Sequence, residues 1–393
     1  MTVPLLDLTL QHRPLEAELK AAFERVLQHG RFILGPEVGL LEKEIAALCQ
    51  ARHAIACASG SDALLLSLMA FDIGPGDAVI TTPFSFFATA SCIARVGARA
   101  VFADINLCCY NLDPAEVLKK ISPRTKAIIP VHLYGQSAPI RPWLQVARER
   151  GIRVIEDAAQ AIGAEEHGRP VGALADIGCL SFFPTKNLGG LGDGGMLLTH
   201  DEALAEKLRV LRVHGAVSEY HHRFLGINSR LDTLQAALLR VKLPHLRSWA
   251  DVRIHNAREY TRLLIEAGLS AKPAATTGCS TDEAPARHGP PLILPASCQS
   301  RHVYNQFVIR VRNPALRDPL RRHLEAQGVA TRIYYPEALH LQECFAAWGG
   351  RQGDFPRSEL ACGSTLALPI FPELTAAQLH HVVESLKLFP WSA

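Results

Sequence analysis

The chain has 393 residues, of which 48% are hydrophobic and 20% are charged, a composition typical of a globular protein with room for two domains. Its 41 Lys and Arg residues nearly balance its 38 Asp and Glu residues, and no basic run stands out, which argues against nucleic acid as a partner. No apolar stretch approaches the roughly 20 residues that span a bilayer, and the first residues lack the basic end and apolar core of a signal peptide. We therefore expect a cytoplasmic protein with no membrane partner.

Apolar runs alternate with amphipathic helices over the first part of the chain. The pattern predicts a strand at 54–58, a helix at 63–70, a strand from 78, a helix at 86–95, a strand at 100–104, a helix at 114–120, a strand at 127–133, a helix at 142–150 and a strand at 152–156. Such alternation is typical of a mostly parallel sheet with helices on both faces. We expect an α/β large domain over 1–245, including an N-terminal arm, and a smaller α+β domain over 246–393.

Small residues separate the first predicted strand from its helix, in the sequence SGSD at 59–62. A helix N-terminus presents free backbone N–H groups, and the Ser61 hydroxyl would join them in binding a phosphate. The alternative is that Ser59 or Ser61 caps the helix, which small hydroxyl residues often do. In company with the lysine described below, the segment favours a phosphate site.

Three phenylalanines follow the next strand, in the sequence PFSFFAT: Phe84, Phe86 and Phe87. An aromatic ring past the carboxyl end of a strand can lie on a cofactor ring, since offset stacking is favourable by about 0.5–1.5 kcal/mol beyond area burial. Core packing is the alternative, and we expect it for at least two of the three.

A single lysine between two apolar runs is the central feature of the chain. The first run, 177–183, is cut by Pro184, and Lys186 stands in a glycine-rich turn before the second run at 196–199. A buried strand that enters a short rigid loop holds such a side chain in one direction. Upstream, another apolar run ends in Asp157, where open sheets bind their ligands. An amine that forms an imine with an aldehyde and a carboxylate that protonates a pyridine nitrogen are the two groups of a pyridoxal phosphate (PLP) site.

Polar aromatic residues gather beyond the lysine turn: His214, Tyr220, His221 and His222. A metal site is one interpretation, but no helical i, i+4 pair supports it. The ten cysteines are scattered without a CxxC pair, so we expect neither a zinc site nor a disulfide framework. A polar loop that reaches a polar substrate is the preferred interpretation.

The second domain begins near residue 246, after a long helix that Pro244 interrupts. Residues 272–300 are rich in Pro, Ala, Thr and Gly, and we expect a long surface loop there. Farther on, the pattern predicts strands at 303–311 and 329–335, a helix at 314–327 and a final helix from Thr375.

The chain resembles the sugar-nucleotide aminotransferases of the DegT/DnrJ/StrS type over nearly its whole length, except about 270 to 300. Eight segments carry the resemblance in order and spacing: ASGSDALLLSL, TPFSFFATA, KAIIPVHLYGQ, VIEDAAQAIGA, SFFPTKNLGGLGDGGMLLT, INSRLDTLQAALLRVKL, YYPEALHLQ and ALPIFPELT. The resemblance implies the aspartate-aminotransferase fold, which is fold type I of the PLP enzymes. It also implies a homodimer with shared active sites.

The resemblance further implies a role for each matching residue. Lys186 forms the imine with the cofactor, and Asp157 pairs with the pyridinium nitrogen. The other implied cofactor contacts are Gln160 at the phenolic oxygen, Phe86 stacked on the ring, Gly60, Ser61 and Ser181 at the phosphate, and Asn228 reaching the phosphate from the partner subunit. The implied substrate contacts are Tyr220, His222, Tyr334 and His340.

The implied reaction is a ping-pong transamination. L-Glutamate gives its amino group to the cofactor, and a keto group of a hexose linked to dTDP or UDP then accepts it, with C3 favoured over C4. The product is an amino sugar for polysaccharide, lipopolysaccharide or natural-product biosynthesis. Departures from the family pattern lie mainly where the sugar nucleotide is expected: Glu219 replaces a common lysine, Ile227 a tyrosine and Tyr334 a histidine, whereas Ser61 replaces threonine and keeps the hydroxyl.

Three alternatives remain. A branch of the family that removes a 3-hydroxyl has histidine at the lysine position, and Lys186 argues against it. A noncatalytic sensor or regulatory protein of the same fold need not keep the imine-forming amine. An amino-acid aminotransferase would need an arginine clamp for two carboxylates, for which Arg332 and Arg230 are candidates without a supporting motif.

Overall fold

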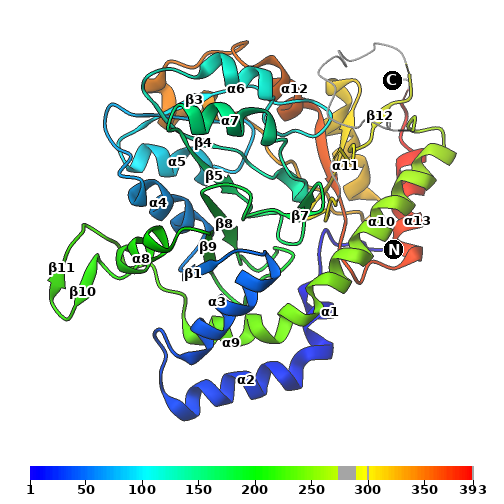
Figure 1. Cartoon of the computed structure of the whole chain (residues 1–393). Coiled ribbons are helices and arrows are strands. Elements are labelled where there is room, and N and C mark those ends of the chain that lie inside the picture. Colours follow the sequence, from blue (N-terminus) through cyan, green and yellow to red (C-terminus); the bar gives the residue numbers. More distant parts are fainter. Residues whose placement is uncertain (273–288, 299–300, 392–393) are drawn as a thin grey trace.

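A seven-stranded mixed sheet forms the centre of the molecule (Figure 1). The computed structural model describes residues 1–272, 289–298 and 301–391. Within the sheet, β9 runs antiparallel to both of its neighbours, β1 and β8, and all other neighbouring strands are parallel. The strands lie in the order β1 (His53–Cys57), β9 (Gly195–Thr199), β8 (Ile177–Ser181), β5 (Arg153–Asp157), β4 (Thr125–Ile129), β2 (Ala78–Thr81) and β3 (Arg99–Phe102).

Both faces of this sheet are buried, because apolar side chains point to both sides of its strands. In β1, Ala54 and Ala56 belong to one buried cluster, whereas Ile55 and Cys57 belong to the other. This is the two-residue period of a strand. Near-continuous apolar runs are the pattern of a sheet covered on both faces, and the predicted α/β class with a mostly parallel sheet is confirmed.

Helices form a layer on each face of the sheet (Figure 1). One layer contains α3 (Pro36–Leu48), α6 (Pro114–Lys120), α7 (Arg141–Glu149) and α9 (Thr233–Lys242). The other contains α4 (Gly60–Ala70), α5 (Ala88–Arg95) and α8 (Glu202–Leu211). Helix α2 (Glu16–His29) packs against α9, and the short α1 (Leu8–His12) precedes it.

The strand directions bring three chain segments to one edge of the sheet. Strands β5 and β8 are parallel neighbours, so their last residues, Asp157 and Ser181, lie at the same edge. Strand β1 is antiparallel to β9, as β8 is, so the turn from β1 into α4 at Gly60 opens at this edge too. Ligands of open α/β sheets bind at the carboxyl ends of the strands.

A smaller antiparallel sheet and its helices form a second core. The sheet contains β12 (Leu292–Ile293), β13 (Phe307–Val311) and β14 (Thr365–Leu368). Side chains of α10 (Leu246–Glu266), α11 (Arg317–Ala326) and α13 (Ala376–Lys387) share its buried cluster, and α12 (Pro356–Ser364) precedes β14. Val3 of the N-terminal arm belongs to this cluster as well, so the arm packs against the C-terminal part of the chain.

Several sequence-based boundaries differ from the structure. The strand predicted at 329–335 is wrong, because this segment makes only isolated bridges with two different partners, Val3 and Ala367. The strand predicted at 303–311 begins at Phe307, and the helix predicted at 86–95 begins at Ala88. Most of the tract at 272–300 lies outside the described residues. The predicted start of the last helix is confirmed by a capping box between Thr375 and Gln378.

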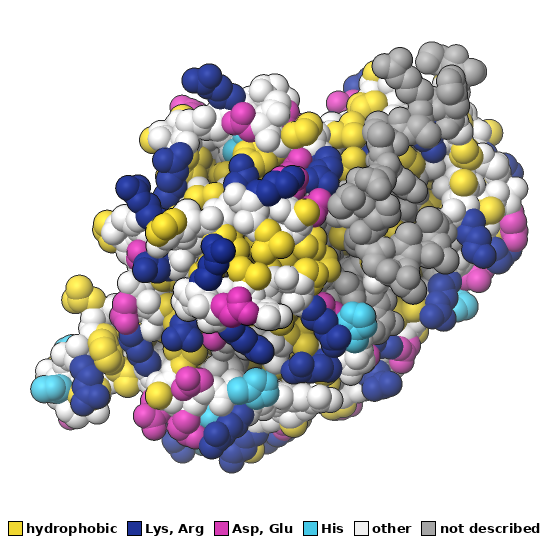
Figure 2. Space-filling view, turned by 45° about the horizontal axis from the view of Figure 1, so that its top comes forward, with side chains coloured by type: hydrophobic (Ala, Val, Ile, Leu, Met, Phe, Trp, Pro, Cys, Tyr) yellow, Lys and Arg dark blue, Asp and Glu magenta, His cyan; other side chains and the backbone are white. Residues whose placement is uncertain are grey.

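Two short hairpins complete the fold: β6 (Glu165–Glu166) with β7 (Arg169–Pro170), and β10 (Ala216–Ser218) with β11 (His221–His222). On the face seen in Figure 2, positive and negative side chains are interspersed, as the near-zero net charge of +3 suggests. Among the described residues, no helix combines the length and the apolar character needed to cross a membrane.

Candidate active site

Lys186 lies in a loop that its own backbone closes. The Phe182 N–H donates to the Gly194 carbonyl over 2.8 Å, and the Gly190 N–H donates to the Phe182 carbonyl over 2.7 Å. The buried Lys242 ammonium also donates to the Gly189 carbonyl, over 2.5 Å. These contacts hold the segment between β8 and β9 from both ends, so the backbone that carries Lys186 has a fixed course.

Asp157 ends β5 in a buried position, with 5% of the residue exposed. Its Oδ2 accepts a hydrogen bond of 2.8 Å from Thr89 Oγ1, and its Oδ1 accepts one of 3.3 Å from the Ala159 N–H. Burial raises the pKa of this carboxyl, and the hydrogen bond from Thr89 opposes that shift. The two hydrogen bonds therefore fix the orientation of this carboxyl group.

The charges of Lys186 and Asp157 act on each other. Burial lowers the pKa of Lys186 from 10.5 to about 8, and the negative charge of Asp157 pulls it upward again. In turn, the positive charge of Lys186 lowers the pKa of Asp157. A lysine with a pKa of about 8 has an appreciable neutral fraction at pH 7, as a nucleophilic amine requires.

Gln160 is held on both sides of its amide. Its Oε1 accepts a hydrogen bond of 2.7 Å from the Tyr134 N–H, and its Nε2 donates one of 3.1 Å to the Tyr335 hydroxyl. The Phe86 ring is 58% exposed, and its centroid lies 6.4 Å from that of Tyr335. Sequence reasoning missed Tyr335, although it stands in the quoted segment YYPEALHLQ, and it also missed Thr89.

Gly60 and Ser181 meet at the edge of the sheet. A Cβ built on Gly60 would lie 2.7 Å from Ser181 Cβ, so only glycine fits there without displacing the serine. Ser59 caps α4, since its Oγ accepts from the Asp62 N–H over 3.1 Å, whereas Ser61 is exposed in the first turn. The capping alternative therefore holds for Ser59, and the Ser61 hydroxyl has access to a ligand.

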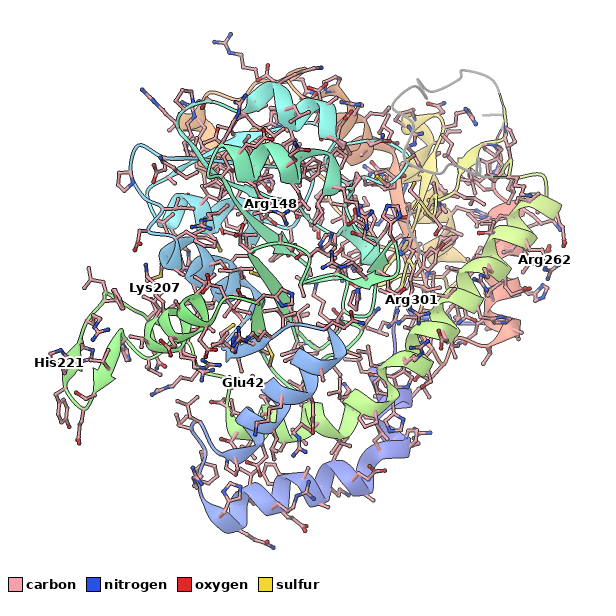
Figure 3. The ribbon with its side chains drawn as sticks, viewed as in Figure 1. Glu42, Arg148, Lys207, His221, Arg262 and Arg301 are labelled. Atoms are coloured by element: carbon pink, nitrogen blue, oxygen red, sulfur yellow. The ribbon has the colours of Figure 1, made fainter. Side chains whose placement is uncertain are left out.

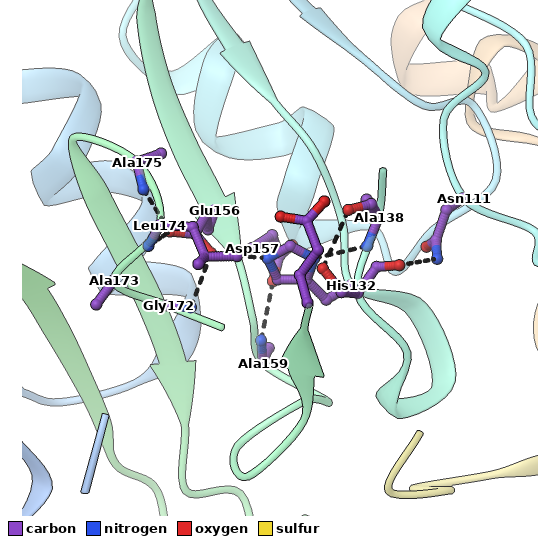
Figure 4. Close-up of polar contacts among 12 residues, drawn as sticks. Asn111, His132, Ala138, Glu156, Asp157, Ala159, Gly172, Ala173, Leu174 and Ala175 are labelled. Carbon is purple, nitrogen blue, oxygen red and sulfur yellow. Dashed lines mark hydrogen bonds and ion pairs between the residues drawn. The ribbon is translucent and has the colours of Figure 1, made fainter. Parts of the chain in front are cut away.

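A buried network stands behind Asp157 (Figure 4). The carboxylate of Glu156 accepts hydrogen bonds from the backbone N–H groups of Gly172, Leu174 and Ala175, at 2.7–2.9 Å. His132 Nδ1 accepts from the Ala138 N–H, so its proton is on Nε2, which donates to Glu156 over 2.9 Å. The backbone N–H of His132 also donates to the backbone carbonyl of Asp157. This network fixes the backbone that carries Asp157.

Two expected site residues, Tyr220 and His222, lie apart from this group within the single chain, whereas Asn228 lies next to a residue that contacts the β1–α4 turn. Tyr220 and His222 belong to the β10–β11 hairpin, which projects from the body of the molecule, with its neighbour His221 labelled in Figure 3. Tyr220 is 90% exposed. Asn228 is exposed beyond the hairpin, and its neighbour Ser229 donates a hydrogen bond to Asp62 in the first turn of α4.

The two expected substrate contacts in the segment YYPEALHLQ line different cavities. Tyr334 lines a cavity beside the lysine loop together with Thr185. His340 is 3% exposed and lines another cavity with Phe102; its Nε2 contacts Glu359 over 3.1 Å. The structure therefore groups Tyr334 with the lysine loop and does not group His340 with it.

The DegT/DnrJ/EryC1/StrS aminotransferase family matches residues 14–387 of this chain. The chain belongs to this family. It is 47% identical over 390 residues to the "Pleiotropic regulatory protein" of Geobacillus stearothermophilus, with 99% of both chains covered. It is 43% identical over 380 residues to the UDP-N-acetyl-3-dehydro-alpha-D-glucosamine 3-aminotransferase of Acidithiobacillus ferrooxidans, with 97% and 96% covered. The crystal structure of DesV from S. venezuelae matches with a TM-score of 0.90 at 40% identity, covering 98% of each chain.

Membership confirms the predicted family, the enzyme class and fold type I, and it identifies PLP as the cofactor. The residues of this aminotransferase fit that group. A buried carboxylate and a lysine of lowered pKa act on each other, and the side-chain-free position at Gly60 leaves room beside Ser181. The exposed ring of Phe86 and the amide of Gln160 both lie close to Tyr335. An amine suits the aldehyde of PLP, a carboxylate its pyridine nitrogen, an open backbone position its phosphate and an aromatic side chain its ring.

Proposed function

We propose that this aminotransferase moves the amino group of L-glutamate onto a C3 keto group of a UDP- or dTDP-linked hexose. The observation that carries the proposal is that Asp157 ends β5 and Lys186 follows β8, its parallel neighbour in the sheet, and that their charges act on each other. The sugar nucleotide and the C3 position rest on the relative from A. ferrooxidans, which is named as a UDP-sugar 3-aminotransferase. The product is an amino sugar for polysaccharide, lipopolysaccharide or natural-product biosynthesis.

PLP, when bound, supplies an aldehyde that takes up the amino group and a ring that absorbs negative charge. In the first half-reaction, Lys186 Nζ takes the proton from the donor carbon that bears the amino group. In the second half-reaction, it gives a proton to the sugar carbon that receives the amino group. The Asp157 carboxylate holds the proton of the pyridine nitrogen in place, oriented by Thr89. The other cofactor contacts in this proposal are Gln160, Phe86, Gly60, Ser61 and Ser181.

A homodimer with shared sites is part of the proposal. Tyr220 in the β10–β11 hairpin is 90% exposed, and Leu225, just after the hairpin, is 94% exposed. Large apolar side chains that project together in this way are typical of a surface that a partner covers. We assign Tyr220 and His222 to the substrate of the partner subunit and Asn228 to its cofactor phosphate. A substrate contact by Tyr334, a cytoplasmic location and a division into domains at 1–245 and 246–393 complete the proposal. A substrate contact by His340 stays a prediction, because this buried residue lines another cavity.

The test uses the purified protein loaded with PLP. Addition of L-glutamate alone should convert the absorption of the lysine-bound cofactor into that of the pyridoxamine form, with release of 2-oxoglutarate. Later addition of 3-keto sugar nucleotides, with 4-keto isomers for comparison, should reverse the change and yield an amino sugar detectable by mass. Lys186→Ala is the negative control. No conversion by glutamate would overturn the proposal, and turnover of 4-keto isomers alone would move it to C4.

A regulatory function is the second candidate, because the relative from G. stearothermophilus is named a regulatory protein. A regulator would bind PLP without turnover. Retention of both Lys186 and Asp157 favours the enzyme, since a binding module needs no amine of lowered pKa. The same glutamate experiment separates the two candidates.

A further inference from the structure

Two cysteines that are 190 positions apart in the chain are neighbours in the structure: Cys108 Sγ and Cys298 Sγ lie 3.3 Å from each other. We propose that these two thiols form a reversible disulfide that fastens the segment before β13 to the part of the chain that follows β3. The proposal assigns a site of oxidative modification to this protein. It does not depend on the proposed function.

Gln136 connects the two segments that carry these thiols. Its side-chain Oε1 accepts a hydrogen bond of 2.6 Å from the Cys298 backbone N–H, and its backbone carbonyl accepts one of 3.3 Å from Asn111 Nδ2. The Asn111 carbonyl accepts from the Asn106 N–H over 2.8 Å, and Asn106 Oδ1 accepts from the Cys108 N–H over 3.0 Å. A chain of hydrogen bonds through one buried glutamine therefore sets the distance between the two thiols.

The separation of the sulfur atoms suits bond formation. The S–S bond of a disulfide is about 2.05 Å long, so the two atoms must approach each other by roughly 1.3 Å. A rotation of either side chain about its Cα–Cβ bond moves its sulfur by such a distance. The backbone contacts of both segments can therefore persist when the bond forms.

Both thiols are also within reach of a small reagent, because Cys108 and Cys298 are only partly buried. Fully buried cysteines elsewhere in the described chain differ in this respect. Burial raises the pKa of Cys49 and Cys92 to about 12, so the thiolate, which is the reactive form, is rare at these positions. Exposure and proximity thus single out the pair of Cys108 and Cys298.

The co-reactant is a low-molecular-weight disulfide such as oxidised glutathione. One cysteine thiolate attacks a sulfur of the reagent, which forms a mixed disulfide and releases one glutathione thiol. The second cysteine thiolate then attacks the protein sulfur of the mixed disulfide and releases the second glutathione thiol. The two cysteines lose two electrons and two protons, and the reagent gains them. An excess of reduced thiol reverses both steps, as expected of a redox-responsive disulfide in a reducing compartment.

The bond would join two parts of the fold that belong to different sheets. Cys108 lies between β3 of the large sheet and α6, whereas Cys298 lies between β12 and β13 of the small sheet. A cross-link that closes a long loop restricts the unfolded chain more than one that closes a short loop. We therefore expect the oxidised protein to be more resistant to heat than the reduced one. The spacing of cysteines along the chain gave no sign of this pair, because the tertiary structure creates it.

The test treats the PLP-loaded full chain with oxidised glutathione and then blocks the remaining thiols. Digestion with trypsin in the absence of a reductant should yield a species that joins peptide 100–119 to peptide 288–301, and dithiothreitol should separate the two. Cys108→Ser and Cys298→Ser should each abolish this species. The matched control is Cys344→Ser, which removes an exposed cysteine and should keep it. Oxidation should raise the Tm of the unaltered protein by several degrees and leave that of Cys298→Ser unchanged.

Three results would overturn the proposal. The first is the absence of the joined species, with or without separate glutathione adducts on the two peptides. The second is a joined species that persists in Cys108→Ser, which would assign the bond to Cys109. The third is a joined species without any rise in Tm, which would show that the bond fastens nothing. Each readout is independent of transamination, so failure of this proposal and failure of the proposed function are distinguishable.

Discussion

Thr89 Oγ1 lies 2.8 Å from Asp157 Oδ2 and donates a hydrogen bond to it, although the two residues are 68 positions apart. The Thr89 hydroxyl is itself 2.9 Å from Ser85 Oγ. Because Thr89 is in the first turn of α5 and Asp157 ends β5, the contact joins a helix of one layer to the edge of the sheet. It opposes the rise in the pKa of Asp157 that burial causes.

Replacing this hydroxyl with a methyl group tests the contact. We expect Thr89→Val to lower kcat about tenfold, because Asp157 loses an orienting donor and its pKa rises further. A carboxyl of higher pKa ionises only at higher pH, so the acid limb of the rate profile should shift to higher pH. Thr365→Val is the control, since Thr365 is also buried and its Oγ1 donates to a carbonyl. Equal losses of kcat in both variants would contradict the assignment.

The pKa of Lys186 predicts how the cofactor-free protein takes up PLP. The neutral amine attacks the aldehyde, and burial brings the pKa from 10.5 to about 8. Below pH 8 most of the amine is protonated, so the rate should rise with pH and level off above about 8. Rapid-mixing absorption measurements over a pH series report this rate. A rate that keeps rising towards pH 10 would mean that the lysine has the pKa of an exposed one.

Gly60 is expected to tolerate no side chain. Gly60→Ala places a Cβ 2.7 Å from Ser181 Cβ, so one of the two must move. We expect PLP affinity to fall at least about tenfold, measured by equilibrium dialysis. Gly39→Ala is the matched control, because Gly39 lies inside α3 with no atom within 4 Å of its built Cβ. That change should keep PLP affinity and stabilise the fold by about 0.5–1 kcal/mol.

The network behind Asp157 should contribute to stability. Glu156→Gln replaces a carboxylate that accepts three backbone N–H groups with an amide whose NH₂ faces donors. We expect the free energy of unfolding to fall by about 3 kcal/mol in urea titrations. Glu149→Gln, an exposed position on α7, should change it by less than about 0.5 kcal/mol. A change that small for Glu156→Gln would show that the network is dispensable.

The β1–α4 turn shows how far sequence reasoning reached into the site. A small-residue turn between an apolar strand and a helix is a local pattern, and it predicted that Ser59 or Ser61 either caps the helix or binds a phosphate. The structure identifies Ser59 as the cap and leaves Ser61 exposed. From the sequence, Gly60 and Ser181 were expected only to bind the same phosphate, and no contact between them was predicted. Their closeness depends on β1 and β8 flanking β9, which no local pattern encodes.

The amino-acid sequence by itself determined the α/β class and the lysine and aspartate at the ends of two apolar runs, because strand periodicity and turn residues act over a few positions. The tertiary structure decided which distant side chains contact the neighbours of these two residues. Tyr335 reaches Gln160 across 175 positions, and Asn305 reaches Asn187 across 118. Such contacts depend on how the layers and the small sheet close around the sheet edge, and that closure is a property of the whole packed chain.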